Sequence, residues 1–563
     1  MRSFKGFGFV CLILFLLLSA CSNEGNAEGE EKTKEGTTEE EKQAASADPV
    51  EIELLDYGEK MGLELEAPAS EEATTMPLKG EIDQADELNE DYLWVVLRKR
   101  DHIEEIKDKK FEYFIPIENG QFAKELNLHH GEGEYVVTVR LPSEEDNEED
   151  TYYYAAEFTV DNLEDGIERD VELSKFGVEN GLEMTENIAG WNNAEGIFEV
   201  SGTVGDDYQG KRLFAEVEKD SEKNHVVIPI EDGEFSGEVP LNYGEGTHTI
   251  NLQLIDGDGN EDDALYYDSA KLYVNNESEK ELPEFNEYED YLDSGLMLET
   301  PAMDVDITQE QIEYPIKGKI DKDAPLAENI EYVIVSIEQM EDHDKATYYI
   351  PVEDYEFEDM THFRFGPGEY EVTFNIPEPD QEEGPKYYYL SVLSLKHEVE
   401  DIDDKRDLLP SRGTESDDPV IIDKAEEITE GLDSDREKAK AIYEYVAKNI
   451  DYDVEKFDDD VFNPDDNAID TLESGKGICQ DYTFLTTALL RSVDIESRYI
   501  EGHAGARHAW VEAKVDGEWI ELDPTWGAGY VDGDEFIAEY NDDYFDPDED
   551  LMEETHTRQG VKY

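Results

Sequence analysis

The stretch Phe114-Ile115-Pro116-Ile117-Glu118 returns twice along the chain, and this return decides the architecture. Its counterparts are Val227-Ile228-Pro229-Ile230-Glu231 and Tyr349-Ile350-Pro351-Val352-Glu353. Each copy precedes a Gly-x-Gly stretch and a tyrosine-rich segment, so several landmarks recur in one order at intervals of roughly 115 to 120 residues. This recurrence indicates three copies of one module, at residues 49–162, 170–276 and 285–398.

Each copy alternates apolar and polar residues and is divided by glycine-rich turns. Tyr135-Val136-Val137-Thr138-Val139 is an example of the strand pattern. Many short strands in about 100 residues predict an antiparallel β-sandwich. The Gly-x-Gly-x-Tyr stretch resembles the strand beside the tyrosine corner of immunoglobulin-like domains, although the second copy has His248 in place of the tyrosine. No cysteine pair occurs in the copies, which excludes an antibody-type domain.

The composition is strongly acidic. The chain of 563 residues holds 46 Lys plus Arg and 147 Asp plus Glu, which gives a formal charge of −101. Nucleic-acid binding requires a positive face, so this function class is excluded. The hydrophobic fraction of 38% is sufficient for several cores, and the length predicts several domains.

The N-terminus has the pattern of a secretory signal. Arg2 and Lys5 precede an apolar run at residues 7–18. Leu18-Ser19-Ala20-Cys21 resembles a bacterial lipobox, which implies removal of residues 1–20 and lipidation of Cys21. Residues 21–48 are polar and lack aromatic side chains, which predicts a disordered acidic spacer. We therefore expect a protein anchored by lipid at the extracytoplasmic face of the cell membrane.

A polar linker at residues 399–419 separates the repeats from a region of different pattern, at residues 420–535. Apolar spacing predicts a helix that begins at Cys479. The chain has three cysteines, and after cleavage and lipidation Cys479 is the remaining thiol. Free N–H groups and the positive end of the helix dipole lower the pKa of a thiol at this position, so Cys479 is a candidate nucleophile.

A β-hairpin is predicted downstream of this helix. His508 and Asp523 fall on its two strands, around the turn Asp516-Gly517. An imidazole can take the thiol proton while a carboxylate orients the ring and stabilises its positive charge. His503 competes for the same role but lies nearer a glycine-rich turn.

These residues carry a resemblance to a known family. The boxes around them are similar to the Cys, His and Asp boxes of the transglutaminase-like superfamily, namely Gly477-Ile478-Cys479-Gln480-Asp481-Tyr482, Arg507-His508-Ala509-Trp510 and Trp519-Ile520-Glu521-Leu522-Asp523-Pro524-Thr525-Trp526. The resemblance implies a papain-like α+β domain with Cys479 as nucleophile, His508 as base and then acid, and Asp523 as orienting carboxylate. The superfamily includes cross-linking enzymes, proteases, amide hydrolases and inactive members, so the reaction stays open.

Several other residues are candidates for the cleft. The oxyanion donors are expected to be the N–H of Cys479 and one further group, and the candidates for that group and for the cleft walls are Tyr452, Gln480, Tyr482, Trp510 and Trp526. No metal site or cofactor is expected, because no short ligand pair is present. A calcium-like run at residues 256–262 lacks the turn glycine and fits a hairpin turn better. Residues 536–563 form an acidic tail that lies in solvent or at an edge, or else covers the cleft or repels acidic substrates.

The sequence thus predicts a multidomain protein with three β-sandwich repeats and a papain-like domain. Its expected activity is thiol acyl transfer or hydrolysis, through a Cys thioester that water or an amine resolves. The substrate is expected to be a protein or a cell-wall peptide. The repeats serve as a stalk or bind a surface polymer. The alternative is a non-catalytic surface module for binding or adhesion, with a degenerate papain-like domain.

Overall fold

The computed structural model describes residues 48–100, 110–144, 150–256, 265–302, 308–379, 381 and 384–563. The signal at residues 1–20, the lipidation at Cys21, nearly all of the spacer, and residues 257–262 of the calcium-like run lie outside these ranges. Within the described ranges, none of the helices is long and apolar enough to cross a bilayer.

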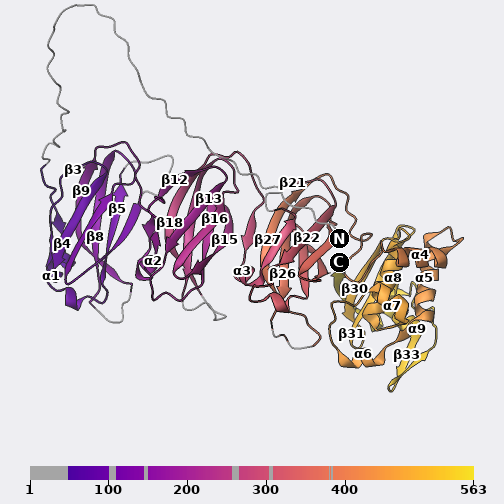
Figure 1. Ribbon diagram of the computed structural model, residues 1–563. Coiled ribbons are helices and arrows are strands. Elements are labelled where there is room, and N and C mark those ends of the chain that lie inside the picture. Colours follow the sequence, from indigo (N-terminus) through magenta and orange to yellow (C-terminus); the bar gives the residue numbers. More distant parts are fainter. Residues whose placement is uncertain are drawn as a thin grey trace, which may run out of the picture. The chain divides into compact units, whose positions relative to one another are not determined.

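The first repeat consists of two facing sheets, which form a sandwich (Figure 1). One sheet has the order β1-β9-β8-β5-β6 with β3 beside β9, and the other has the order β2-β4-β7. Its elements are β1 (Glu53–Leu54), α1 (Asp56–Met61), β2 (Leu63–Leu65), β3 (Glu71–Glu72), β4 (Thr75–Ile82), β5 (Tyr92–Lys99), β6 (Lys110–Pro116), β7 (Gln121–Asn127), β8 (Gly133–Pro142) and β9 (Tyr152–Asn162).

The second and third repeats reproduce this strand order. The second contains β10 (Glu172–Leu173), α2 (Lys175–Glu179), β11 (Glu183–Met184), β12 (Trp191–Ala194), β13 (Ile197–Thr203), β14 (Arg212–Lys219), β15 (Glu222–Glu231), β16 (Glu234–Pro240), β17 (Gly246–Ile255) and β18 (Tyr266–Asn276). The third contains β19 (Phe285–Glu287), α3 (Tyr291–Ser294), β20 (Leu296–Thr300), β21 (Thr308–Gln309), β22 (Glu313–Ile320), β23 (Tyr332–Gln339), β24 (Asp344–Pro351), β25 (Glu356–His362), β26 (Gly368–Pro377) and β27 (Tyr389–Val399).

The alternating sequence pattern explains the sandwiches. Along β22 every second residue is buried, so one face of the strand enters the core while the other meets solvent. The Tyr135 hydroxyl donates to the Gly131 carbonyl at 2.8 Å, and the Tyr370 hydroxyl donates to the Gly366 carbonyl at 2.7 Å. These bonds have the form of a tyrosine corner. The predicted fold class, sandwich repeats followed by an α+β domain, is confirmed.

The C-terminal domain packs α8 (Cys479–Arg491) against a sheet of order β32-β31-β30-β35. Its other elements are α4 (Pro419–Thr429), α5 (Asp435–Asn449), β28 (Asp451–Tyr452), α6 (Val454–Asp459), α7 (Ala468–Ser474), β29 (Lys476–Gly477), β30 (Ser497–His503), β31 (Arg507–Val515), β32 (Glu518–Leu522), α9 (Pro524–Ala528), β33 (Gly529–Asp532), β34 (Glu535–Ala538), α10 (Glu549–Thr555) and β35 (Thr557–Lys562). Residues 400–418, between β27 and α4, hold no named helix or strand.

The domain extends beyond the predicted boundary at residue 535. The segment predicted as an acidic tail supplies β35, which pairs with β30 in the central sheet. The polar composition of the segment conceals this strand, because an edge strand needs few apolar side chains. Residues 536–563 are therefore part of the domain rather than a tail.

Candidate active site

Cys479 lies at the first position of helix α8, where the sequence places it. The Asp481 carboxylate caps the helix by accepting the N–H of Ile478 at 2.7 Å. As the first helical residue, Cys479 has a backbone N–H without an intrahelical acceptor. The residue is 9% exposed and borders a cavity of about 370 Å³ that His508 also lines. Cys479 thus lies beside a cavity and has a backbone N–H without an intrahelical acceptor.

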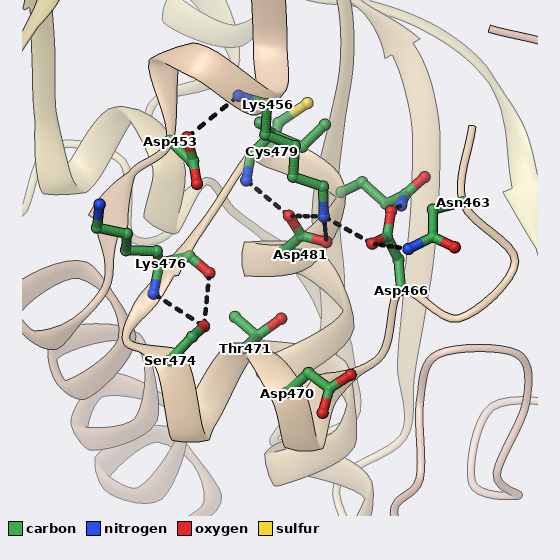
Figure 2. A network of polar contacts seen from close by, with 12 residues as sticks. Asp453, Lys456, Asn463, Asp466, Asp470, Thr471, Ser474, Lys476, Cys479 and Asp481 are labelled. Carbon is green, nitrogen blue, oxygen red and sulfur yellow. Dashed lines mark hydrogen bonds and ion pairs between the residues drawn. The ribbon is translucent and has the colours of Figure 1, made fainter. Parts of the chain in front are cut away.

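A partly buried polar network fixes this end of the helix (Figure 2). The Lys456 ammonium forms an ion pair with Asp481 at 2.8 Å and donates to Asp466 at 2.7 Å. The Gln480 amide donates to the other oxygen of Asp466 at 2.9 Å. Burial raises the pKa of Asp481, while the charge of Lys456 opposes that rise. The network ties α6 to α8 and so determines where the sulfur lies.

His508 and Asp523 meet as predicted from the hairpin. His508 Nε2 lies 2.9 Å from Asp523 Oδ2, and both side chains are buried. The other carboxylate oxygen, Oδ1, accepts the N–H groups of Thr525 and Trp526, both at 3.0 Å. Asp523 is therefore the N-cap of α9, and the proline after it begins the helix. A cap held on two sides leaves the carboxylate with one orientation.

The electrostatics of the pair favour a charged imidazole. Burial alone would lower the pKa of His508, but the charge and hydrogen bond of Asp523, together with Cys479, raise it to about 10. Burial would raise the pKa of Asp523. The charge of His508 and the hydrogen bonds from His508, His556 and the Trp526 N–H instead hold it far below its usual value. At neutral pH the pair is an imidazolium beside a carboxylate.

The structure adds one residue that sequence reasoning missed. His556 Nε2 lies 3.1 Å from Asp523 Oδ2, so two imidazoles share one carboxylate oxygen. His556 Nδ1 lies 2.8 Å from Thr555 Oγ1, and its ring packs 4.8 Å from the ring of Trp526. The residue follows α10, inside the segment predicted as a tail. No local signal marks it, because its partner lies 33 positions earlier in the chain.

His508, Asp523 and His556 together have the chemistry of a metal-binding group. Their ligand atoms lie within 4.8 Å of one another. The two imidazole-to-carboxylate separations are hydrogen-bond lengths, so a cation would have to displace the protons that join these side chains.

Of the remaining residues predicted for the site, some lie in the core and others line a cavity. Tyr482 is in the core and donates to the Ile450 carbonyl at 2.5 Å. Trp510 is buried and donates from Nε1 to Glu521 at 3.2 Å. Trp526 is half-buried and lines a second cavity, of about 600 Å³, with His508 and Tyr452. No hydrogen bond of the Tyr452 hydroxyl is found among the described residues. Tyr452 and Trp526 thus line this second cavity, whereas Tyr482 and Trp510 are core residues.

Gln480 and His503 are poorly placed for the roles considered for them, oxyanion donor and catalytic histidine. Gln480 lines the cavity beside Cys479, but its amide is already engaged by Asp466. His503 is exposed at the end of β30, where it pairs across the sheet with Arg507. The hydrogen-bonded partner of Asp523 is His508, so the structure favours His508 over His503 for the histidine role.

A thiol at a helix start, with an imidazole on an adjoining sheet and a carboxylate just after one of its strands, defines a cysteine-enzyme domain of the papain-like kind. Residues 422–524 match the family model of the Transglutaminase-like superfamily. The C-terminal part of the chain is therefore a transglutaminase-like domain.

Known proteins resemble parts of the chain. The kyphoscoliosis peptidase of Mus musculus is 29% identical over 130 residues, which are 20% of this chain and 19% of that protein. The match thus spans about a fifth of this relative's length. The solved structure of a TGase is 18% identical and covers 30% of this chain and 48% of its own, with a TM-score of 0.18. The FN1–FN3 domains of chicken CNTN1 are 9% identical and cover 60% of this chain and 97% of their own, with a TM-score of 0.13.

Proposed function

We propose that this protein is a thiol acyl-transferase or hydrolase of the transglutaminase-like type, anchored by lipid on Cys21 at the extracytoplasmic face of the membrane. The observation that carries the proposal is the His508–Asp523 pair, buried beside a cavity that Cys479 shares. The partner substrate is a protein or a cell-wall peptide that offers a carboxamide or peptide carbonyl.

The reaction begins with Cys479. The sulfur attacks the carbonyl carbon, and its proton resides on His508, whose positive charge Asp523 stabilises. The tetrahedral intermediate collapses, the C–N bond breaks, and His508 gives its proton to the departing ammonia or amine. A thioester remains on Cys479. Water or an amine then attacks it, loses a proton to His508, and releases an acid or a new amide as the sulfur leaves.

The developing oxyanion requires hydrogen-bond donors. The N–H of Cys479 supplies one, because it opens α8 without an intrahelical acceptor. Tyr452 is the better second donor among the candidates, since it lines the neighbouring cavity, which also contains His508, while the Tyr482 hydroxyl and the Gln480 amide are engaged elsewhere. Removing one such donor lowers kcat by about 100-fold or more. Tyr452→Phe tests the assignment, with Tyr540→Phe as the matched control.

The decisive test is labelling by a thiol-directed acyl probe, located by peptide mapping. Wild-type protein carries the label on Cys479. Cys479→Ala abolishes both labelling and turnover, a loss of roughly 1,000-fold or more. Ser492→Ala, at the other end of α8, is the control and retains both. Turnover of casein in Cys479→Ala protein would refute the proposal.

The rate of Cys479 alkylation at pH 7 gives a second test. The pKa of His508 is raised to about 10, so the imidazolium persists at neutral pH and disappears only as the pH rises through about 10. A positive ring beside the sulfur stabilises the negative charge of an attacking thiolate and speeds alkylation. In His508→Asn protein the rate of alkylation at pH 7 falls, because this charge is absent. An unchanged rate would favour a non-catalytic binding module.

The anchor has its own test. Cells that express the full chain are supplied with radiolabelled fatty acid. The label enters wild-type protein and Cys479→Ala protein, but not Cys21→Ser protein. Labelling of the Cys21→Ser protein would contradict the proposed site.

A further inference from the structure

The cavity around Cys479 continues into a larger one that the third repeat helps to build. The larger cavity measures about 920 Å³ and shares Pro385, Gln480, Tyr499 and Arg507 with the cavity around Cys479. One wall comes from the C-terminal domain and the other from the third repeat, through Tyr349 on β24 and through residues 387–389 at the start of β27. We call the two joined cavities the cleft.

The third repeat is held against the C-terminal domain at this cleft. The ring centroids of Tyr387 and Phe462 lie 5.6 Å apart, and those of Tyr349 and Phe462 lie 5.9 Å apart. The Phe462 N–H donates to the Gly384 carbonyl at 2.8 Å. The Tyr332 hydroxyl donates to Asp465 at 2.5 Å. Aromatic side chains from both modules therefore form one continuous wall.

The charge of the larger cavity is opposite to that of the chain. Around it lie seven Lys and Arg residues and two Asp and Glu residues, whereas the chain as a whole has 46 and 147. Around the smaller cavity, beside Cys479, lie two Lys and Arg residues and four Asp and Glu residues. Three of the seven are neutralised in ion pairs, Arg406 with Asp344, Arg498 with Asp407, and Lys562 with Glu501. Four have no ion pair with the described residues: Lys345, Lys386, Arg412 and Arg507.

Arg412 is the most costly of these cations to leave unpaired. Burial lowers its pKa, and its buried Nε has no hydrogen-bond partner among the described residues. Its guanidinium lies 4.4 Å from the Phe462 ring centroid and 5.1 Å from that of Tyr349. The Arg412 side chain is half-buried and donates from Nη2 to the Asn463 carbonyl at 3.0 Å, but it has no anionic partner among the described residues. A partly desolvated cation of this kind is stabilised when an anion reaches it. Lys386 and Arg507 are exposed at the same cleft and can approach the same ligand.

We propose that the third repeat and the C-terminal domain together bind an acidic peptide, which extends from Tyr387 to Cys479 with its carboxylates on Lys386, Arg412 and Arg507. This rests on the proposed function, since the peptide is the acyl substrate of Cys479. The aromatic walls accept the peptide chain, and the cations select its charge. The positive larger cavity also concentrates an anionic ligand that the rest of the surface repels.

The test measures peptide binding to Cys479→Ala protein, so that catalysis is not required. The probe is a fluorescent eight-residue peptide with one central glutamine flanked by glutamates. Its matched neutral peptide has glutamine in place of each glutamate. We expect at least tenfold tighter binding of the acidic peptide at low salt, and a smaller difference at 0.5 M salt. Lys386→Glu with Arg507→Glu removes the preference, while Lys319→Glu, an exposed cation of the same repeat outside the cleft, retains it.

Two further arms separate the outcomes. If the charge-reversed protein does not fold, the double variant Lys386→Met with Arg507→Met replaces it. We expect this variant also to lose the preference for the acidic peptide. Equal affinity for both peptides, a preference that survives the substitutions, or tighter binding of a short polyphosphate than of the acidic peptide would overturn the inference. Protein with Cys479 intact is then assayed for turnover of the same peptides. Charge-dependent binding without turnover would refute the proposed function but support the peptide-binding cleft. Turnover without charge preference would support the proposed function but refute the peptide-binding cleft.

Discussion

The three repeats share one fold but differ at the position two residues before the first glycine of the Gly-x-Gly motif. This residue is His129 in the first repeat, Asn242 in the second and Arg364 in the third, and all three are fully buried. In each repeat it bonds the segment that leads to the next module. His129 Nδ1 accepts the Asp170 N–H at 3.3 Å, and Asn242 Nδ2 donates to the Pro283 carbonyl at 2.9 Å.

Arg364 makes more bonds at the equivalent place. Its guanidinium donates to the carbonyls of Arg406, Leu409 and Pro410 at 2.6–3.0 Å. Buried Arg491 of α8 donates to the same Leu409 carbonyl at 2.7 Å. The segment after the third repeat is therefore held from both modules. The three repeats thus share one backbone arrangement, but the arginine of the third repeat makes more hydrogen bonds to the following segment. This is possible because arginine offers five donors, and histidine or asparagine fewer.

Arg364→Met is expected to have the largest effect on stability, because it removes the side chain that distinguishes the third repeat. The side chain retains its volume, but three carbonyls lose a charged donor, so we expect about 3 kcal/mol less stability at this junction. Hydrogen exchange of residues 405–411 reports the loss as faster exchange, and turnover falls because the wall of the cleft moves. Lys319→Met is the control. Unchanged exchange in the Arg364→Met protein would show that the three bonds do not hold the segment.

Acidification is expected to affect the junction after the first repeat, which contains His129, differently from the junction after the third, which contains Arg364. Burial, reinforced by the charges of Arg169 and His130, lowers the pKa of His129 well below its usual value. Below pH 6.5 the unfolded chain takes up a proton that the folded chain refuses, so stability falls as the pH falls. The loss is at most about 1.4 kcal/mol per pH unit.

Urea unfolding at pH 7.0 and 5.5, followed by tryptophan fluorescence, measures this difference. The transition of the first repeat moves to lower urea at pH 5.5. In His129→Gln protein it moves less, because the titrating group is gone. An equal shift in both proteins would assign the pH dependence to other groups.

Sequence reasoning reached the parts of the site that local patterns encode. Cys479 at a helix start, and His508 opposite Asp523 across a hairpin, follow from periodicity and turn chemistry. His556 and Arg364 do not, because each acts on residues more than 30 positions away, and no local pattern specifies those contacts. The cleft could not be predicted from the sequence either, since it depends on which face of the third repeat meets the C-terminal domain.

Asn242→Ala gives the smallest expected effect and sharpens the comparison. Its side chain makes one bond to the linker, and its buried Oδ1 has no hydrogen-bond partner among the described residues. Removing the amide costs the bond to Pro283 but also relieves an unsatisfied oxygen, so we expect a loss of about 1 kcal/mol. Urea unfolding measures it, with Asn275→Ala, at a half-buried asparagine of the same repeat, as control. A loss as large as that of Arg364→Met would mean that burial at this position, rather than the number of bonds it makes, determines how firmly each junction is held.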